Sequence, residues 1–386
     1  MLSVDGAVIE RLAEVWQGFI DQGTIVGGVL LVAQDGEIRH ACARGWADRE
    51  RRIPVERASR FRLASLTKLL TSVTALRLCE LEVLSLDTPI SDWLKSFRPR
   101  LADGREPPIT LRHLLSHSCG LSYGFEQPPG NAYAQAGISD GLDLVSLDLQ
   151  QNLQRLASVP LLFEPGSGWG YSLATDVVGA IIEQASGLAL SQALDRWVTG
   201  PLGMNATAFS LAEGQRLVRA YKDGSDGPEP LGDHDVLVLD SGHAAVSSLR
   251  AFAPGAYVSG GAGLLGTADD YLRLLECLRL GGAPLLTATS TASLLGNAIG
   301  DIVMEGRGAG WKFGLGPLIL SDPAQARHPQ GAGCWSWCGL YGSHYWVDPV
   351  AGISLVALTN TAVAGAWGAL ADGLVEAIYG HRPGRT

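Results

Sequence analysis

The chain has 386 residues, of which 46% are hydrophobic and 18% charged, and its formal net charge at pH 7 is −10. This composition supports a large buried core and excludes a disordered chain. The acidic balance, with Lys and Arg scattered singly, argues against nucleic acid and anionic lipid as partners. No stretch approaches the ~20 apolar residues that a membrane span needs, so we expect no membrane-spanning segment.

The N-terminal segment predicts an amphipathic helix rather than a secretory signal. Val8, Leu12 and Trp16 share one face of such a helix, whereas Asp5 and Glu10 stand where a signal would carry basic charge. The six cysteines are widely spread through a long chain, which is not the pattern of a disulfide framework. We therefore expect a reducing compartment, with the cytoplasm as the default.

Strand patterns lie near both ends of the chain. They occupy residues 26–33, 38–44, 336–347 and 353–358. A turn signal, Asp35-Gly36, separates the first two runs, and the last two are expected to form a hairpin. Residues 86–244 instead combine short helical patterns with loops rich in Pro and Gly. We expect one sheet built from residues 1–85 and 245–386, beside a mainly helical lobe of residues 86–244.

Three helices are predicted outside that middle segment in addition to the N-terminal one. The run from Leu66 to Leu81 contains no Gly or Pro, which predicts a buried helix with Ser65 at its start. Thr267 begins a capping-box pattern before a helix over residues 271–280. Residues 366–378 predict a last helix.

Three short motifs have a catalytic or binding interpretation that their context does not support. Residues 120–124 match the nucleophile elbow G-x-S-x-G, but a helical run precedes them where a strand is required. Residues 261–266 match the dinucleotide motif G-x-G-x-x-G, but the second strand ending in an acidic residue is missing. His113 and His117 lie four apart, without the Glu of a metalloprotease helix. We therefore expect neither a metal nor a cofactor.

Ser65 and Lys68 form a fourth pattern, S-x-x-K. The chain contains only four lysines, and only Lys68 follows a serine by three positions. At the start of an apolar helix, both side chains project from the same face, one turn apart. Burial near a helix N-terminus disfavours the ammonium, so Lys68 can act as a base for Ser65. Covalent acyl transfer requires this arrangement of nucleophile and base.

The chain resembles the serine β-lactamase and penicillin-binding-protein superfamily, and it is most similar to the class C-like branch that includes the family VIII carboxylesterases. The resemblance covers nearly the whole chain, in order. It rests on F-R-L-A-S-L-T-K (61–68), L-R-H-L-L-S-H-S-C-G-L (111–121), F-E-P-G (163–166), Y-S-L-A-T-D (171–176), G-G-A-G-L-L-G-T-A-D-D (260–270) and W-C-G (337–339). It implies a class C-like α/β fold, with a central antiparallel sheet flanked by helices and a mainly helical lobe.

The resemblance also implies roles for individual residues. Ser65 is then the nucleophile, Lys68 its base partner, and Tyr171 a tyrosine that shuttles the proton. A phenol has an ordinary pKa of about 10, and we expect the Lys68 ammonium to stabilise its phenolate, so that the two groups titrate as a pair. The backbone N–H groups of Ser65 and Leu340 are expected to form the oxyanion hole.

Two motifs depart from the β-lactamase pattern. Leu173 ends the second motif where β-lactamases of this branch carry Asn. In the third motif, W-C-G replaces K-T-G, and an indole and a thiol cannot supply the charge that recognises a carboxylate. Esterases similar to this chain carry W-G-G, so the cysteine is a departure even among them. The residues expected to contact substrate are Trp337, Cys338, Gly339, Tyr123, Trp169 and Tyr341.

The resemblance thus implies a serine carboxylesterase that hydrolyses neutral small-molecule esters through an acyl-enzyme at Ser65. An acyltransferase, an amide hydrolase or a weak β-lactam hydrolase of the same fold is the alternative, because the same three residues serve each reaction. A non-catalytic binding protein that keeps the fold is a further alternative.

Overall fold

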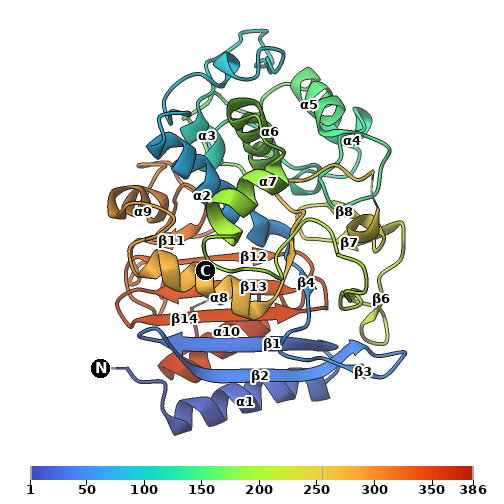
Figure 1. Cartoon of the computed structure of the whole chain (residues 1–386), viewed down its shortest axis with the longest axis vertical. Coiled ribbons are helices and arrows are strands. Elements are labelled where there is room, and N and C mark those ends of the chain that lie inside the picture. Colours follow the sequence, from blue (N-terminus) through green and yellow to red (C-terminus); the bar gives the residue numbers. More distant parts are fainter. Residues whose placement is uncertain (1, 254, 385–386) are drawn as a thin grey trace.

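The computed structural model describes residues 2–253 and 255–384, and its centre is an eight-stranded sheet with the order β10-β11-β12-β13-β14-β1-β2-β3 (Figure 1). All neighbouring strands are antiparallel. The strands are β1 (Gly27–Gln34), β2 (Glu37–Asp48), β3 (Ile53–Pro54), β10 (Trp311–Phe313), β11 (Leu318–Leu320), β12 (Cys334–Gly339), β13 (Ser343–Asp348) and β14 (Ile353–Thr359). The pairing of β1 with β14 confirms that both ends of the chain build one sheet.

Helices and short strand pairs surround this sheet. The helices are α1 (Gly6–Asp21), α2 (Thr67–Glu80), α3 (Leu111–Leu115), α4 (Ala132–Gln135), α5 (Leu149–Ser158), α6 (Ala174–Ser186), α7 (Leu190–Leu194), α8 (Ala268–Arg279), α9 (Ala288–Leu295) and α10 (Ala369–Tyr379). Single turns are η1 (Ala64–Leu66), η2 (Ile90–Asp92), η3 (Gly124–Glu126), η4 (Asp195–Thr199) and η5 (Arg250–Phe252). The short strands pair as β4 (Phe61–Arg62) with β9 (Leu265–Gly266), β5 (Tyr221–Lys222) with β6 (Glu229–Pro230), and β7 (Asp235–Val238) with β8 (His243–Val246).

The sheet is covered on both faces, which explains the nearly continuous apolar run of β1. Alternate residues of a strand point to opposite faces. Val29 and Leu31 accordingly belong to the larger core, whereas Leu30 and Val32 belong to a second core beneath α1 and α10. Trp16 of α1 is fully buried in that second core. Helix α8 packs against β14 and β1.

Helix α2 is buried along nearly its whole length. It packs against α6, α7 and α9, so apolar or small residues are needed on every side rather than on one stripe. Figure 1 shows it descending from the helical part of the molecule toward the sheet. The segment before α2 therefore lies where the helices meet the sheet.

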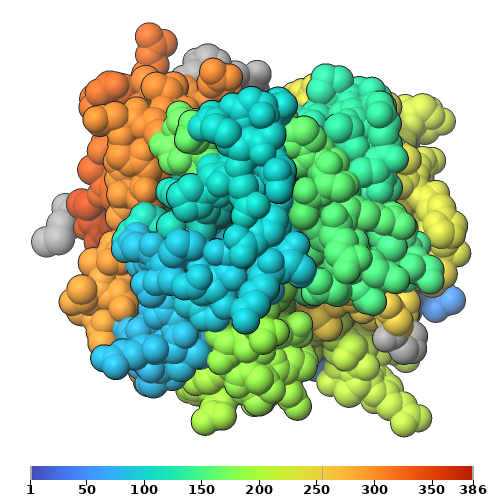
Figure 2. Space-filling model, turned by 90° about the horizontal axis from the view of Figure 1, so that it is seen from above, coloured from blue at the N-terminus to red at the C-terminus, as the bar shows by residue number. Residues whose placement is uncertain are grey.

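The middle of the chain covers the end of the molecule farthest from α1. Figure 2 looks onto this face, where light blue and green residues predominate and the orange region that includes α9 lies at one side. Residues 86–244 contain α3 to α7 and several short strands. The expected lobe boundary at residue 244 falls inside β8, and the division into two lobes stays a prediction.

Element boundaries differ from the predictions mainly at turns. Residues 336–347 are not one strand, because the chain turns at residues 340–342 between β12 and β13. Gly342 adopts φ +104° there, a conformation that favours glycine. The predicted last helix begins at Ala369 rather than at residue 366. The predicted capping residue of α8, Thr267, accepts a hydrogen bond from the Asp270 N–H.

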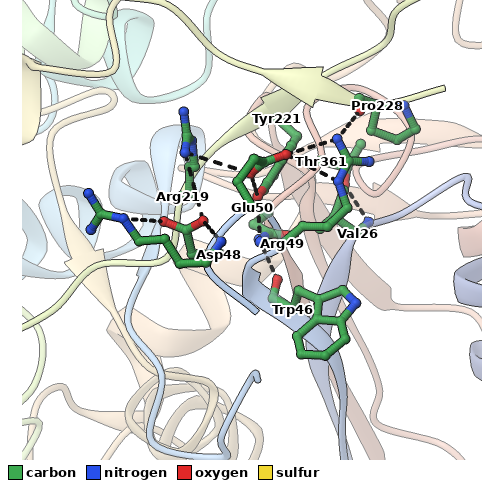
Figure 3. Close-up of polar contacts among 11 residues, drawn as sticks. Val26, Trp46, Asp48, Arg49, Glu50, Arg219, Tyr221, Pro228 and Thr361 are labelled. Atoms are coloured by element: carbon green, nitrogen blue, oxygen red, sulfur yellow. Dashed lines mark hydrogen bonds and ion pairs between the residues drawn. The ribbon is translucent and has the colours of Figure 1, made fainter. Parts of the chain in front are cut away.

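A polar network fastens the middle segment to the sheet (Figure 3). The Tyr221 hydroxyl donates to Glu50 Oε2 at 2.6 Å and accepts from the Arg49 N–H at 2.8 Å. Arg49 Nη2 donates to the Pro228 carbonyl at 2.8 Å, and Arg219 Nη1 lies 3.6 Å from Glu50 Oε2. The end of β2 is thus joined to β5 and to the turn before β6.

In the part of the chain that the structure describes, no single helix has the length and apolar composition to cross a membrane. Only α6 followed by residues Leu190–Thr199 passes that test jointly, and the two helices meet at a bend of 83°.

Candidate active site

Ser65 lies in a strained turn between β4 and α2. The preceding residue, Ala64, adopts φ +45°, a left-handed conformation that is costly for a residue with a Cβ. The turn η1 then places Ser65 two residues before the start of α2, where it is half-buried. The helix predicted from residue 66 is confirmed with a start at Thr67.

Lys68 is buried beside Ser65, and no carboxylate among the described residues is in direct contact with it. Its Nζ donates to the Tyr123 hydroxyl at 2.8 Å, to the Gly261 carbonyl at 2.9 Å and to Ser65 Oγ at 3.3 Å. Burial lowers the pKa of Lys68 from 10.5 to about 7, and the more distant Asp176 opposes this shift. A substantial fraction of Lys68 is therefore neutral at neutral pH and able to accept a proton.

Tyr171 is the second side chain, beside Lys68, that is hydrogen-bonded to Ser65. Its hydroxyl donates to Ser65 Oγ at 2.6 Å and accepts from Trp337 Nε1 at 3.3 Å. Burial raises the pKa of Tyr171 above its ordinary value. At the pH where a phenol would ionise, Lys68 is already neutral, so its amine does not stabilise the phenolate in the way expected from the sequence.

His117 fixes the segment that carries Tyr171. The His117 carbonyl accepts from the Gly170 N–H at 2.9 Å, and its Nδ1 lies 3.0 Å from Ser172 Oγ. The rings of His117 and Tyr171 pack with centroids 5.0 Å apart. The sequence pattern around His117 indicated a structural stretch without showing that it holds the residues on both sides of Tyr171.

Tyr123 and Gly261 complete the surroundings of Lys68, and sequence reasoning assigned neither to this role. Tyr123, expected to contact substrate, is almost fully buried with its hydroxyl against Lys68 Nζ. A Cβ on Gly261 would lie 3.0 Å from the Tyr123 hydroxyl, 3.2 Å from Asp176 Oδ2 and 3.4 Å from Lys68 Nζ. The first glycine of the G-x-G-x-x-G run therefore makes room for the lysine.

The end of β12 lies directly against the Ser65 turn. A Cβ on Gly339 would lie 2.4 Å from the Leu63 carbonyl oxygen and 3.4 Å from Ala64 Cβ. Glycine permits this approach, which brings the following residue, Leu340, toward Ser65. The two backbone N–H groups named for the oxyanion hole thus come from segments in contact.

The remaining aromatic and thiol candidates occupy different places. Trp337 is buried, and its ring packs against Tyr171 with centroids 5.1 Å apart. Cys338 is half-buried, and burial raises the pKa of its thiol to about 11. Trp169 packs on Phe313 at 5.5 Å, whereas Tyr341 lines a separate cavity.

The G-x-S-x-G run and the His113/His117 pair make contacts that support the fold rather than a reaction. Ser122 of the G-x-S-x-G run is buried, its hydroxyl donates to the Tyr123 carbonyl, and α3 and η3 flank the run. His113 Nδ1 accepts from the Thr110 N–H and so completes the capping box of α3. Within residues 2–253 and 255–384, no group of three or more His, Cys, Asp or Glu side chains is arranged to hold a metal.

Comparison with known proteins gives concordant results. The Beta-lactamase family model matches residues 9–377. The chain is 45% identical over 381 residues to Esterase EstB of Burkholderia gladioli, covering 98% of this chain and 97% of the relative. It is 32% identical over 184 residues, 43% of each chain, to monacolin J acid methylbutanoyltransferase of Aspergillus terreus.

A solved structure extends the likeness to the whole fold. It is EstCE1, described as a hydrolase with promiscuous acyltransferase activity, with a TM-score of 0.93 and 42% sequence identity. The match covers 97% of this chain and 98% of that one, so the α/β fold with a helix-flanked antiparallel sheet is shared throughout. By family model, sequence identity and fold, the chain belongs to the β-lactamase family.

Proposed function

We propose that the protein is a serine ester hydrolase, similar to the family VIII carboxylesterases, that forms an acyl-enzyme at Ser65. The observation that supports this proposal is the pair of hydrogen bonds made by Ser65 Oγ. Ser65 Oγ lies 2.6 Å from the Tyr171 hydroxyl and 3.3 Å from Lys68 Nζ. A nucleophile within reach of a buried amine whose pKa is about 7 is the arrangement that acyl transfer requires.

In the proposed acylation, neutral Lys68 receives the Ser65 proton while Oγ forms a bond to the acyl carbon. The N–H groups of Ser65 and Leu340 hold the resulting oxyanion. When the ester C–O bond breaks, the leaving alkoxide takes the Tyr171 proton, and the Lys68 ammonium restores that proton to the phenolate. Tyr171 therefore acts as a neutral donor, in keeping with the raised pKa of its hydroxyl.

In the proposed deacylation, water attacks the acyl carbon and the same pair of side chains carries the proton. Neutral Lys68 removes a proton from water, directly or through Tyr171, as the new C–O bond forms. When the bond to Ser65 Oγ breaks, that oxygen takes the proton held by the Lys68 ammonium, directly or through Tyr171, and the acid is released. The sequence of steps regenerates Ser65 and neutral Lys68 without another reactant.

Neutral esters are the proposed substrate class. The side chain beside Tyr171 is the indole of Trp337, which donates to the phenol and offers no positive charge. The family relative that is 45% identical is an esterase by name, which supports the same reaction class. Neither observation defines the alcohol or the acyl chain.

The test is a series of p-nitrophenyl esters from acetate to dodecanoate, with nitrocefin in parallel, for wild type and Ser65→Ala. We expect ester turnover that falls at least about a thousandfold in Ser65→Ala, together with slow or no nitrocefin turnover. Ser122→Ala is the matched control, because it removes a buried hydroxyl from the competing G-x-S-x-G run. Activity that persists in Ser65→Ala and disappears in Ser122→Ala would refute the assignment.

Acyl transfer to an alcohol or amine is the second candidate function. It is favoured by the solved relative with promiscuous acyltransferase activity, which shares 42% of its sequence with this chain. The two functions differ only in the molecule that attacks the acyl-enzyme. Measuring free acid and the new ester or amide at rising acceptor concentration separates them, since a transferase forms the new ester from an alcohol, or the new amide from an amine, in proportion to acceptor.

The proposed compartment is a reducing one. All six cysteines are unpaired thiols, and four of them are buried. Equal thermal stability with and without a reducing agent is the expected result, whereas a loss of stability on reduction would contradict it.

A further inference from the structure

A cavity of about 750 Å³ adjoins the candidate active site without including Ser65 among its lining residues. Its wall shares three segments with the site. Arg62 lies three positions before Ser65, Tyr341 follows Leu340, and Ala262 follows Gly261. Apolar side chains of the wall include Leu142, Leu194, Phe209, Leu211 and Phe252. This size and this lining are typical of small-molecule sites.

The Arg62 guanidinium on this wall is buried without a carboxylate partner. The residue is 8% exposed, and its Nη1 and Nη2 donate to the carbonyls of Val218 and Ser248 at 3.1 and 2.7 Å. Its Nε–H has no hydrogen-bond partner among residues 2–253 and 255–384. The ring centres of Phe252 and Tyr341 lie 5.9 and 5.8 Å from its central carbon. Because a guanidinium stays protonated in proteins, this buried charge favours an anion.

Arg250 brings a second guanidinium to the same cavity. It donates to the main-chain carbonyls of Asp143 and Tyr257 at 2.8 and 2.7 Å and packs over the Tyr257 ring at 4.7 Å. Among the residues described, neither Arg62 nor Arg250 lies within 4.0 Å of a carboxylate oxygen. Asp195 also lines the cavity, at an exposed position.

We propose that this cavity binds an organic carboxylate with an apolar body, and that Arg62 and Arg250 hold its carboxylate. Guanidinium groups bind carboxylates through paired, charge-assisted hydrogen bonds, and the apolar wall accommodates the rest of the molecule. Two sources share this chemistry: a carboxylate carried by an ester substrate, which would extend the substrate class beyond the neutral esters proposed above, or a free acid such as the hydrolysis product. Both sources rest on the proposed function, whereas the binding site itself does not.

Binding is tested directly on Ser65→Ala protein by calorimetric titration with octanoate, adipate and, as the uncharged probe, octanol. We expect saturable binding of the two acids and little or none of octanol. Arg62→Gln and Arg250→Gln, each in the Ser65→Ala background, should raise the Kd for octanoate about ten- to a hundredfold. Arg39→Gln is the matched control, because Arg39 is an exposed arginine of β2 paired with Glu37.

A filled cavity provides a test that keeps both arginines. Ala251 lines the cavity, so Ala251→Phe should also abolish octanoate binding while the protein stays folded by circular dichroism. If Arg62→Gln does not fold, Ala251→Phe still tests whether the cavity binds octanoate. Equal affinity for octanoate and octanol, or an unchanged Kd in both Arg250→Gln and Ala251→Phe, would overturn the proposal.

The source is identified by comparing mono-p-nitrophenyl adipate with p-nitrophenyl hexanoate as substrates. For a substrate carboxylate, Arg250→Gln lowers the ratio of their kcat/KM values at least about tenfold. For a free acid, octanoate alters hexanoate ester turnover in wild type and does so less in Arg250→Gln. Carboxylate binding without esterase activity would refute the proposed function alone, and esterase activity without carboxylate binding would refute the cavity site alone.

Discussion

At the scale of single residues, burial acts in the same sense on both polar neighbours of Ser65. The same removal from water that favours the neutral amine of Lys68 also favours the neutral phenol of Tyr171. In the proposed mechanism the two groups therefore take complementary parts, with Lys68 accepting a proton and Tyr171 donating one.

The first prediction concerns the pH dependence of activity. Because Lys68 must be neutral to accept the Ser65 proton, kcat/KM should rise with pH through an apparent pKa of about 7 and then level off. Initial rates with p-nitrophenyl butyrate between pH 5 and 9 measure this profile. A profile that rises only above pH 9 would contradict a lysine base with a lowered pKa.

The second prediction concerns stability and the same amine. In the unfolded chain Lys68 has a pKa near 10.5, so between about 7 and 10.5 the unfolded state binds more protons than the folded one. The contribution of Lys68 to folding therefore becomes more favourable as pH rises across that window. Lys68→Met should flatten this part of the curve, measured as the urea midpoint at each pH. An unchanged slope would show that the amine is protonated in the folded state.

The third prediction concerns the indole of Trp337. Trp337→Phe removes the donor that lies 3.3 Å from the Tyr171 hydroxyl, so kcat/KM should fall about two- to tenfold. Trp169→Phe is the control, because Trp169 Nε1 has no partner, and the kinetic constants of that variant should stay closer to wild type. Equal losses in both variants would indicate an effect of ring size alone.

At the scale of elements, the site depends on the approach of β12 to the turn before α2. Sequence reasoning selected Ser65 and Lys68 from the chemistry of a short local motif, and Tyr171 from its position in the family resemblance. It missed the roles of Tyr123, Gly261 and Arg62, because each depends on a neighbour distant in the chain.

The strand predictions show the same difference between what neighbouring residues reveal and what depends on packing between distant segments. The turn signal at Asp35-Gly36 and the strand patterns on both sides of it predicted the β1–β2 pair. By contrast, the β12–β13 turn was overlooked although Gly339 and Gly342 flank it, because β13 is buried on both faces and no alternation sets the two strands apart. Residue periodicity carries little information where both faces of a strand are covered.

The fourth prediction belongs to this scale. In Gly339→Ala the added Cβ would lie 2.4 Å from the Leu63 carbonyl oxygen, so β12 must move away from the Ser65 turn. We expect kcat/KM to fall at least about a hundredfold, since small misplacements of reacting groups are costly.

Gly18→Ala is the matched control for that variant. Gly18 lies inside α1 with nothing within 4 Å of an added Cβ. Its replacement should leave kinetics unchanged and raise the free energy of unfolding by about 0.5–1 kcal/mol. Unchanged kinetics in Gly339→Ala would show that the approach of β12 is not needed.

At the scale of the whole molecule, the sheet separates two hydrophobic cores, and only the larger one lies on the side of the candidate active site. The larger core lies on the side of α2 and the site, and the second core lies beneath α1 and α10. The fifth prediction uses this separation. Trp16→Ala should lower the free energy of unfolding by about 3–5 kcal/mol through the cavity it leaves. Because Trp16 belongs only to the second core, kcat/KM of the folded variant at low temperature should match wild type.

Urea denaturation followed by circular dichroism measures the first quantity, and p-nitrophenyl ester turnover the second. Trp16→Phe is the control and should show a smaller loss of stability, since it leaves a smaller cavity. A change in kcat/KM at full folding would show that the two cores are coupled across the sheet.

The pairing of β1 with β14 also has a consequence for how the protein is made. Just before β1, the Val26 N–H donates to the side chain of Thr361, which lies just after β14 and 335 positions later in the chain. During translation, the turn that carries Ser65 leaves the ribosome long before β12 has been synthesised. Contacts of such long range form late and slowly. A nascent or prematurely terminated chain would therefore expose a serine without Trp337 and Leu340, and esterase activity would begin only when synthesis is complete.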